Sequence, residues 1–250
     1  MIKPVAIILA GGFGKKMGKL SEDIPKSLID SGGIPLIQRV IAYSELETRC
    51  QKIIVSAGHL GNVLEDYFSD RKVRVGCPIS VDIEETPLGT GGALLRLFQK
   101  YGLSDALVLN GDLILKVRNY SLDSFYRTCY RMIPSSLGLF SVAEARNTHF
   151  RYQVSYRENF AIESFQKNYD SNVPGEINTG MYFIKRGIFE YRPSDSPSFS
   201  LERELIPSVL TSGAVIQAFP LTPHAFVDMT TESDYRYVQE NAHEISRKDW

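Results

Sequence analysis

The chain has 250 residues, 43% of them hydrophobic, which is enough to bury a core without disulfide or metal crosslinks. Lys and Arg number 28 and Asp and Glu number 29, so the formal net charge is −1 and the chain has no net field for a long polyanion. A general nucleic-acid binder is therefore excluded. The three cysteines, Cys50, Cys77 and Cys129, lack Cys-x-x-Cys spacing, which argues against a zinc site or a disulfide framework and favours a reducing compartment.

The first apolar run, at residues 5–10, shows no alternation of apolar and polar side chains. This pattern predicts a strand buried on both faces of a mostly parallel sheet. The run is also too short for a signal-peptide core or a membrane span, so we expect a cytoplasmic protein without a membrane partner.

Helical and strand patterns then alternate along the first half of the chain. In order, we predict a helix over 35–46, a strand over 53–55, a helix over 60–68, a strand over 79–83, a helix over 92–99 and a strand over 106–109. Such alternation is typical of βαβ units, in which helices cover parallel strands and ligands bind at the carboxyl ends of the strands.

From about residue 136 the predicted elements have shorter connections. Strands are expected over 137–143, 153–156, 161–165 and 180–184, and closing helices over 199–210 and 232–245. The expected fold class is therefore α/β, with a Rossmann-like, mostly parallel mixed sheet flanked by helices. Because no repeat or linker is evident, a single domain over residues 1–250 is favoured, with a split near residue 115 as the alternative.

A glycine-rich loop follows the first predicted strand directly. Gly11, Gly12 and Gly14 stand beside Lys15 and Lys16. Glycines permit positive φ and let backbone amides approach an anion closely, so the loop is a candidate phosphate cradle. Neither G-x-G-x-x-G nor the P-loop motif is complete here, which excludes both fingerprints. The alternative is a tight strand-to-helix turn with exposed lysines.

Further short motifs follow this loop in chain order. They are Pro25-Lys26, Pro87-Leu88-Gly89-Thr90-Gly91-Gly92-Ala93, Asn110-Gly111-Asp112, Asn178-Thr179-Gly180 and Val227-Asp228. Together with residues 9–14, this series resembles the sugar-1-phosphate nucleotidyltransferases, also called nucleotide-sugar pyrophosphorylases. The glycine motif at residues 87–93 and the segment 199–202 most resemble the mannose-1-phosphate and D-glycero-D-manno-heptose 1-phosphate guanylyltransferase branches.

The resemblance implies a fold, a reaction and a cofactor. The fold is that of the nucleotide-diphospho-sugar transferases, without a β-helix domain, with a nucleotide-binding half at 1–115 and a sugar-phosphate-binding half at 116–250. A sugar-phosphate oxygen attacks the α-phosphorus of a nucleoside triphosphate and pyrophosphate leaves. The expected partners are these two substrates, and Asp112 and Asp228 are expected to hold Mg²⁺. The alternative for both aspartates is a role in a turn or a helix cap.

The resemblance also assigns roles to individual residues. The expected catalytic residues are Lys16, Lys26 and Asp112. The expected sugar-phosphate-binding residues are Lys167, Asn178, Thr179 and Gly180. The expected nucleotide-binding residues are Leu9, Ala10, Gly11, Gly12, Gly14, Lys26, Glu85, Pro87, Gly89, Thr90, Gly91, Asn110 and Gly111. Glu84 or Glu85 offers a carboxylate that could accept the N1–H and 2-amino donors of guanine, which favours GTP.

Three departures from the family pattern qualify this interpretation. Lys16 stands where the family has an arginine, Gln166 replaces a carboxylate, and residues 229–232 lack a glycine and a proline of the usual turn. A point charge does not reproduce the bidentate fork of arginine at a phosphate. The alternatives are therefore a cytidylyl- or uridylyltransferase on a related sugar phosphate, or a non-catalytic nucleotide-sugar-binding regulatory protein. A homodimer is one open alternative for the oligomeric state.

Overall fold

The computed structural model describes residues 3–70, 73, 75–115, 119–145, 152–167, 175–222 and 226–241. The chain forms two compact units that are interleaved in sequence. Unit 1 comprises Met1–Pro87, Val108–Arg118 and Phe226–Trp250, and unit 2 comprises Leu88–Leu107 and Asn119–Ala225. Strand β4 (Asp105–Asn110) therefore begins in unit 2 and ends in unit 1. The predicted division into 1–115 and 116–250 stays a prediction.

Unit 1 is built on parallel strands. β1 (Val5–Leu9) pairs in parallel with β2 (Lys52–Ala57), which pairs in parallel with β3 (Ile79–Ile83), and the end of β4 is the neighbour of β1. Ala6, Ile7 and Ile8 are fully buried, as expected for a strand covered on both faces. The helical elements of unit 1 are η1 (Lys15–Ser21), η2 (Lys26–Leu28), α1 (Leu36–Tyr43), α2 (Leu46–Arg49), α3 (Gly61–Ser69) and α7 (Glu232–Glu240).

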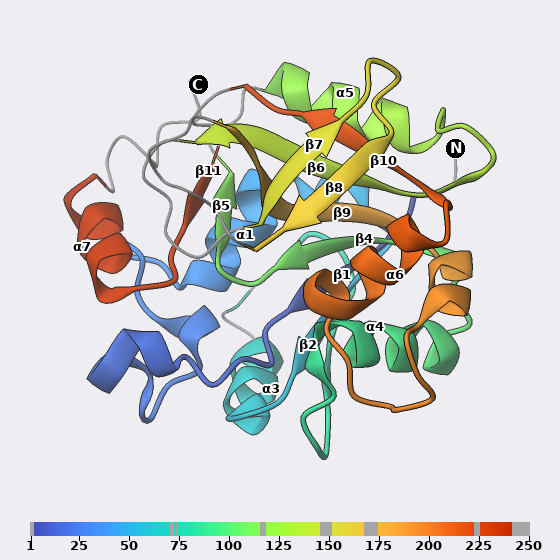
Figure 1. The fold of residues 1–250 in the computed structure, drawn as a ribbon. Coiled ribbons are helices and arrows are strands. Elements are labelled where there is room, and N and C mark those ends of the chain that lie inside the picture. The colour runs from blue at the N-terminus through green and yellow to red at the C-terminus, as the bar shows by residue number, and fades with distance from the viewer. Residues whose placement is uncertain are drawn as a thin grey trace. The chain divides into compact units, whose positions relative to one another are not determined.

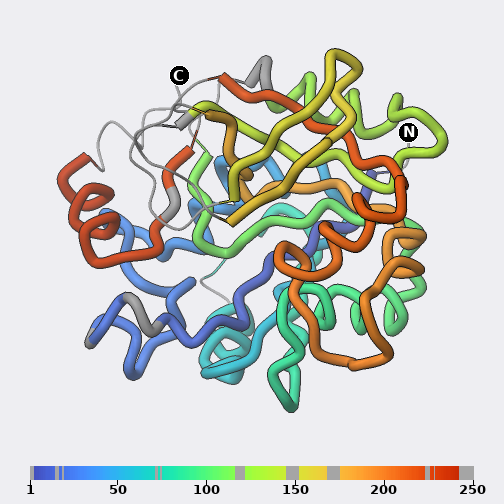
Figure 2. Tube along the Cα trace, viewed as in Figure 1, coloured from blue at the N-terminus to red at the C-terminus, as the bar shows by residue number. Residues whose placement is uncertain are grey.

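A second, short sheet in unit 1 joins segments that lie far apart in sequence. β5 (Leu113–Leu115) pairs antiparallel with β11 (Phe226–Asp228). Figure 2 shows the red C-terminal strand beside the green segment that follows β4. α7 then reaches back to the N-terminal region, where the Gln239 side chain donates a hydrogen bond to the Asp30 carbonyl at 2.8 Å.

Unit 2 contains the antiparallel part of the fold. β6 (Ser136–Ala145) pairs antiparallel with β9 (Gly175–Lys185) and parallel with β10 (Val215–Pro220). β7 (Gln153–Tyr156) and β8 (Ile162–Gln166) form a hairpin, drawn in yellow in Figure 1. The helical elements of unit 2 are α4 (Gly89–Lys100), α5 (Asn119–Cys129), η3 (Arg186–Tyr191), the π turn η4 (Leu201–Leu205) and α6 (Ile206–Thr211).

These elements confirm the predicted α/β class with a mixed sheet, and they correct several boundaries. The helix predicted over 35–46 divides into α1 and α2 because Glu45 adopts a left-handed conformation, with φ of 52°. The helix predicted over 199–210 begins as a π turn, in which the Ile206 amide bonds to the Leu201 carbonyl, and Pro207 then supplies no amide hydrogen. Helix α5 and strand β10 were not predicted.

Among the described helices, none combines the length and the apolar character needed to span a bilayer.

Candidate active site

The loop after β1 packs against the turn after β4 in unit 1. The Gly111 amide donates a hydrogen bond to the Leu9 carbonyl oxygen at 2.9 Å, and a Cβ on Gly111 would lie only 2.8 Å from that oxygen. Only glycine allows this approach. Gly14 has a φ of +63°, and its carbonyl accepts the Ser21 hydroxyl at 2.9 Å. Two motifs that are a hundred residues apart in sequence therefore form one surface.

A carboxylate from the end of β3 lies against this glycine loop. The Glu84 Oε1 atom is 3.3 Å from the position that a Cβ on Gly11 would take, and 2.9 Å from that of a Cβ on Gly58. Glu85, to which the sequence assigned a nucleotide contact, is exposed. The structure thus places Glu84 rather than Glu85 beside the loop. Gly58, which approaches the Gly11 carbonyl, was not predicted, although it directly follows β2.

Lys26 and Asp112 form an ion pair with 2.5 Å between Nζ and Oδ2. Lys26 begins the turn η2 after Pro25, and Asp112 follows the Gly111 turn, so two separate backbone features fix the pair. The side chains are 17% and 24% exposed, which leaves both charged groups within reach of a ligand. The residues expected to contact phosphate and metal are therefore side by side, although they are 86 positions apart in sequence.

The backbone of Asp228 is adjacent to that of Asp112. In the β5–β11 pair Asp228 lies opposite Leu113, and the Met229 amide donates to the Asp112 carbonyl at 3.0 Å. The helix-cap alternative for Asp228 is wrong, because α7 is capped by Thr231. The side chains of Asp228 and Lys16 lie outside the described part of the structure, as do His149, His224 and His243, which we expect to be non-catalytic.

Thr231 and Asp234 rebuild the turn that lacks the family's glycine and proline. The Thr231 hydroxyl accepts the Asp234 amide, and the Asp234 carboxylate accepts the Thr231 amide at 2.7 Å and the Thr230 amide at 3.1 Å. This is a capping box, which satisfies the first free amides of a helix. The substituted residues therefore form a stable helix start directly after β11.

In unit 2 the glycine motif at the start of α4 packs against residues 197–201. The amides of Gly91 and Gly92 donate to the Phe199 carbonyl at 3.0 and 3.2 Å. A Cβ on Gly91 would overlap the Phe199 ring, and a Cβ on Gly92 would overlap the Pro197 carbonyl oxygen. The chain itself thus supplies the acceptor for these two amides, and the predicted nucleotide contact of Gly91 stays a prediction. Their lack of a side chain serves packing.

Thr90, in the same motif, begins a hydrogen-bond chain that crosses unit 2. Its hydroxyl donates to Glu202 Oε2 at 2.8 Å and accepts the Leu201 amide at 2.8 Å. The Tyr182 hydroxyl donates to Glu202 Oε1 at 3.4 Å and accepts the Asn178 side-chain amide at 2.6 Å. Glu202 and Tyr182 were not predicted as site residues, although residues 199–202 had been noted as part of the resemblance.

The remaining predicted sugar-phosphate residues have different environments. Thr179 is 1% exposed, and its hydroxyl forms hydrogen bonds with the Ser141 hydroxyl and carbonyl. Its predicted contact with a ligand is therefore wrong for the side chain. The Gly180 amide donates to Asn178 Oδ1 at 3.3 Å, and Lys167 is exposed just after β8. Lys167 is thus free of the core and accessible to an anion.

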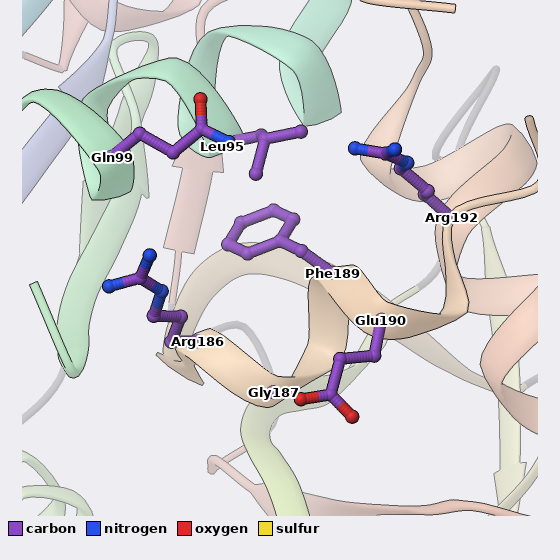
Figure 3. Close-up of a pocket in the computed structure, with 7 residues that line it drawn as sticks. All are labelled: Leu95, Gln99, Arg186, Gly187, Phe189, Glu190 and Arg192. Carbon is purple, nitrogen blue, oxygen red and sulfur yellow. The ribbon is translucent and has the colours of Figure 1, made fainter. Parts of the chain in front are cut away.

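A separate hollow of about 460 Å³ lies in unit 2 between α4 and η3. In Figure 3 the Phe189 ring points toward Leu95 and Gln99, with Arg186 and Arg192 on either side. Arg192 also forms an ion pair with Asp195 at 2.6 Å. None of the described residues that we predicted for substrate binding lines this hollow.

The Asp112 carboxylate fits a magnesium ion whose other ligands are substrate oxygens and water. Asp112 presents a partly exposed carboxylate, and Asp228 follows on the paired strand. Mg²⁺ is usually bound in proteins by one or two carboxylates together with phosphate oxygens and water. No cluster of three or more His, Cys, Asp or Glu residues occurs within the described ranges, so an all-protein cage is not seen there.

Comparison with known proteins agrees with this arrangement. A sequence model of the family described as nucleotidyl transferase matches residues 5–244. The D-glycero-alpha-D-manno-heptose 1-phosphate guanylyltransferase of Aneurinibacillus thermoaerophilus is 28% identical over 239 residues, which cover 94% of this chain and 96% of that protein. The mannose-1-phosphate guanylyltransferase of Mycobacterium tuberculosis is 26% identical over 208 residues, which cover 83% of this chain but only 56% of that protein.

Solved structures give the same picture of the fold. The crystal structure of HddC from Yersinia pseudotuberculosis has a TM-score of 0.77 at 27% identity, and the match covers 96% of this chain and 99% of that one. A UDP-glucose pyrophosphorylase has a TM-score of 0.78 at 17% identity, covering 98% and 99% of the two chains. The predicted nucleotide-diphospho-sugar transferase fold is thereby confirmed.

Proposed function

The chain belongs to the nucleotidyl transferase family, and from this premise we propose that it transfers a nucleoside monophosphate, GMP in the first place, from a nucleoside triphosphate to a sugar 1-phosphate. The products are a nucleoside diphosphate sugar and pyrophosphate. The observation that carries the proposal is the Lys26–Asp112 ion pair. Asp112 directly follows Gly111, whose amide bonds to the Leu9 carbonyl just before the glycine-rich loop. A cation and a carboxylate beside a glycine-rich loop suit a triphosphate and its metal ion.

The preference for guanosine rests on two supports. Glu84 lies beside Gly11, and a carboxylate can accept both the N1–H and the 2-amino donors of guanine, which cytosine and uracil cannot present together. The relatives named as heptose 1-phosphate guanylyltransferases include one from Campylobacter jejuni, 29% identical over 185 residues, and HddC has been crystallised with GMP-PN. The favoured acceptor is accordingly a heptose 1-phosphate, with a hexose 1-phosphate second.

The chemistry requires charge neutralisation and alignment. A phosphate oxygen of the sugar phosphate forms a bond to the α-phosphorus while the bond from that phosphorus to the pyrophosphate oxygen breaks. The attacking oxygen is already ionised near neutral pH, so no general base is needed. Lys26 and Lys16 hold the triphosphate, Lys167 holds the sugar's phosphate, and the amides at Gly11 and Gly12 contact the nucleotide.

We assign the metal to Asp112 and Asp228, with Mg²⁺ as the ion. When bound, it supplies positive charge to phosphate oxygens in a site where the residues alone provide few cations. Before the ion binds, the carboxylate of Asp112 holds Lys26, so the same group contacts both sources of positive charge. A cytoplasmic location and a homodimer complete the proposal.

Pyrophosphate release tests this function directly. The full chain is assayed with MgCl₂ against GTP, CTP, UTP and ATP, each combined with heptose and hexose 1-phosphates. GTP with a heptose 1-phosphate is expected to give the highest kcat/KM. Turnover with CTP or UTP alone would overturn the guanosine assignment. Nucleotide binding in calorimetry with no pyrophosphate from any pair would favour the regulatory alternative, which the replacement of the loop arginine by Lys16 motivates.

A further inference from the structure

Glu202 stands at the junction of two predicted substrate-binding segments of unit 2. Its carboxylate accepts hydrogen bonds from three hydroxyl groups, those of Thr90 at 2.8 Å, Ser200 at 3.2 Å and Tyr182 at 3.4 Å. Thr90 belongs to the glycine motif at the start of α4, and Tyr182 lies on β9, four residues after Asn178. One side chain therefore links the predicted nucleotide loop to the predicted sugar strand.

The link to Asn178 is geometrically defined on both sides. Its side-chain nitrogen donates to the Tyr182 hydroxyl at 2.6 Å, and its oxygen accepts the Gly180 amide at 3.3 Å. These two contacts fix which end of the amide is donor and which is acceptor. The Tyr182 hydroxyl can accept from Asn178 and donate its own hydrogen to Glu202 at the same time. Because an ionised carboxylate can only accept, Glu202 fixes the donor-to-acceptor order of these hydrogen bonds, which runs from Asn178 through Tyr182 to Glu202.

Two tyrosine side chains lie near the Glu202 carboxylate. Burial, followed by the negative charge of Glu202, raises the pKa of Tyr152, whereas Arg203 lowers it. Tyr152 therefore stays a neutral phenol near the carboxylate. The Tyr182 ring is fully buried and makes an edge-on contact with Phe140, with 4.8 Å between ring centroids. Packing holds the ring, so the hydroxyl can be removed without moving it.

We propose that Glu202 is a positioning residue that couples the two substrates. It holds the predicted nucleotide loop through Thr90, and through Tyr182 it holds Asn178, the predicted sugar-binding residue. The inference rests on the proposed function and deepens it. We call the Glu202–Thr90 link the nucleotide arm and the Glu202–Tyr182–Asn178 link the sugar arm. Hydrogen bonds to a charged acceptor are stronger than those between neutral groups, so loss of the carboxylate charge weakens both arms together. Each arm can also be cut separately, which makes the coupling measurable.

Substitutions at three positions test the two arms. Tyr182→Phe keeps the ring but cuts the sugar arm, and we expect KM for the sugar 1-phosphate to rise about tenfold while KM for GTP stays within about twofold. Thr90→Val cuts the nucleotide arm and should show the reverse pattern, which Thr90→Ser should rescue. Glu202→Gln keeps the shape but loses the charge, and we expect both KM values to rise about tenfold with kcat changed less.

The matched control changes a carboxylate on the same turn. Glu204 accepts the Ser200 amide at 2.7 Å, which caps η4 without reaching either substrate arm. Glu204→Gln is expected to leave both KM values within about twofold of the wild type. The double variant Glu202→Gln/Tyr182→Phe should raise KM for the sugar phosphate no further than Tyr182→Phe alone, because both remove the same link.

The two proposals fail in different ways. Unchanged KM values in Glu202→Gln, or equal effects of Glu204→Gln, would overturn the coupling role while the wild type still turned over. Absence of turnover by the wild type with every substrate pair would overturn the proposed function. In that case the same variants are compared by calorimetry with GTP and with heptose 1-phosphate, where binding equal to that of the wild type would overturn the coupling as well.

Discussion

Asp112 neutralises Lys26 at 2.5 Å while 24% of its own side chain remains exposed. A carboxylate buried for structural reasons would be covered more completely, and its loss would cost more stability. The second predicted metal ligand, Asp228, follows on the strand paired with β5. Because Asp112 is partly exposed, we expect its replacement to lower activity much more than it lowers the free energy of unfolding.

Asp112→Asn is expected to lower kcat/KM at saturating Mg²⁺ by about 100-fold or more, because an amide binds both a metal ion and Lys26 weakly. The free energy of unfolding should change by less than about 1 kcal/mol, as for a partly exposed pair. The control is Asp105→Asn at the other end of β4, where the carboxylate accepts only the neighbouring Ser104 hydroxyl among its described hydrogen bonds. Equal activity of the two variants would contradict the metal assignment.

Cys50 gives the protein an alkaline sensitivity that the sequence did not reveal. Burial raises the pKa of its thiol from 9.0 to about 12, with a further contribution from Cys77 and an opposing one from Lys3. The folded state therefore holds the thiol proton more tightly than the unfolded state. This stabilisation is fully present below pH 9 and is lost as the pH rises from 9 to about 12.

Cys50→Ala removes this titration from both states. Between pH 7.5 and pH 10, the wild type is expected to lose about 1 kcal/mol of unfolding free energy relative to the variant. The measurement is urea unfolding of both proteins at the two pH values with a reductant present. A difference between the two proteins that does not depend on pH would contradict the raised pKa.

At the level of elements, the start of α4 shows a helix terminus occupied by the chain itself. The Phe199 carbonyl accepts the amides of Gly91 and Gly92, and no room remains for a Cβ at Gly92. Helix propensity alone would make alanine more stable than glycine there by about 1 kcal/mol. The overlap with the Pro197 carbonyl opposes that preference and is the larger effect.

Gly92→Ala should therefore destabilise the protein by about 2 kcal/mol, with Tm lower by about 5 °C. Gly12→Ala is the matched comparison, since nothing lies within 4 Å of a Cβ at that position, and its Tm should stay within about 2 °C of the wild type. A stabilised Gly92→Ala variant would show that the segment at residue 197 moves aside without cost.

Local patterns predicted the parallel strands well and the long-range contacts poorly. β2 and β4 each contain an uninterrupted apolar run, whereas β3 alternates apolar and polar residues, and all three were expected within a residue or two of their observed ends. α5 was missed because its average composition is polar, and β10 because Gln217 and Pro220 interrupt its apolar pattern. Its pairing with β6 decides that it is a strand.

The same distinction applies to the site. Lys26, Gly111 and Asp112 were predicted as site residues because short motifs of glycine, lysine and aspartate can be recognised in the sequence alone. The hydrogen-bond partners of Glu202 could not be predicted from a short motif, because Thr90 lies 112 residues away in sequence and comes close only in the folded chain. The burial of the Thr179 side chain was not predictable either, because the hydrogen bonds of its hydroxyl with Ser141 join two strands that are distant in sequence.

At the scale of the whole molecule, unit 1 depends on both ends of the chain. β5 obtains its partner from residues 226–228, and Gln239 in α7 binds the Asp30 carbonyl. A chain cut after residue 115 would lose these contacts from within unit 1. The assembly of unit 1 from three separate ranges of the chain was not predicted, because strand pairing between distant segments produces no local sequence pattern.

A fragment of residues 1–115 is therefore expected not to fold, since β5 would expose its unpaired edge and the surface under α7 would be uncovered. The amide spectrum in heteronuclear NMR should lack dispersion, whereas the full chain in the same buffer should show it. A dispersed spectrum and cooperative melting of the fragment would show that residues 226–241 are dispensable for unit 1.

The ion pair in unit 1 has a consequence for how ligands cooperate. Lys26 and Asp112 each satisfy the other's charge, so an anion that attracts the lysine must compete with the aspartate, and a cation that attracts the aspartate must compete with the lysine. Each ligand removes the competitor of the other. By thermodynamic reciprocity, a triphosphate and a divalent cation should therefore strengthen each other's binding by the same factor, even before any direct bond between them is counted.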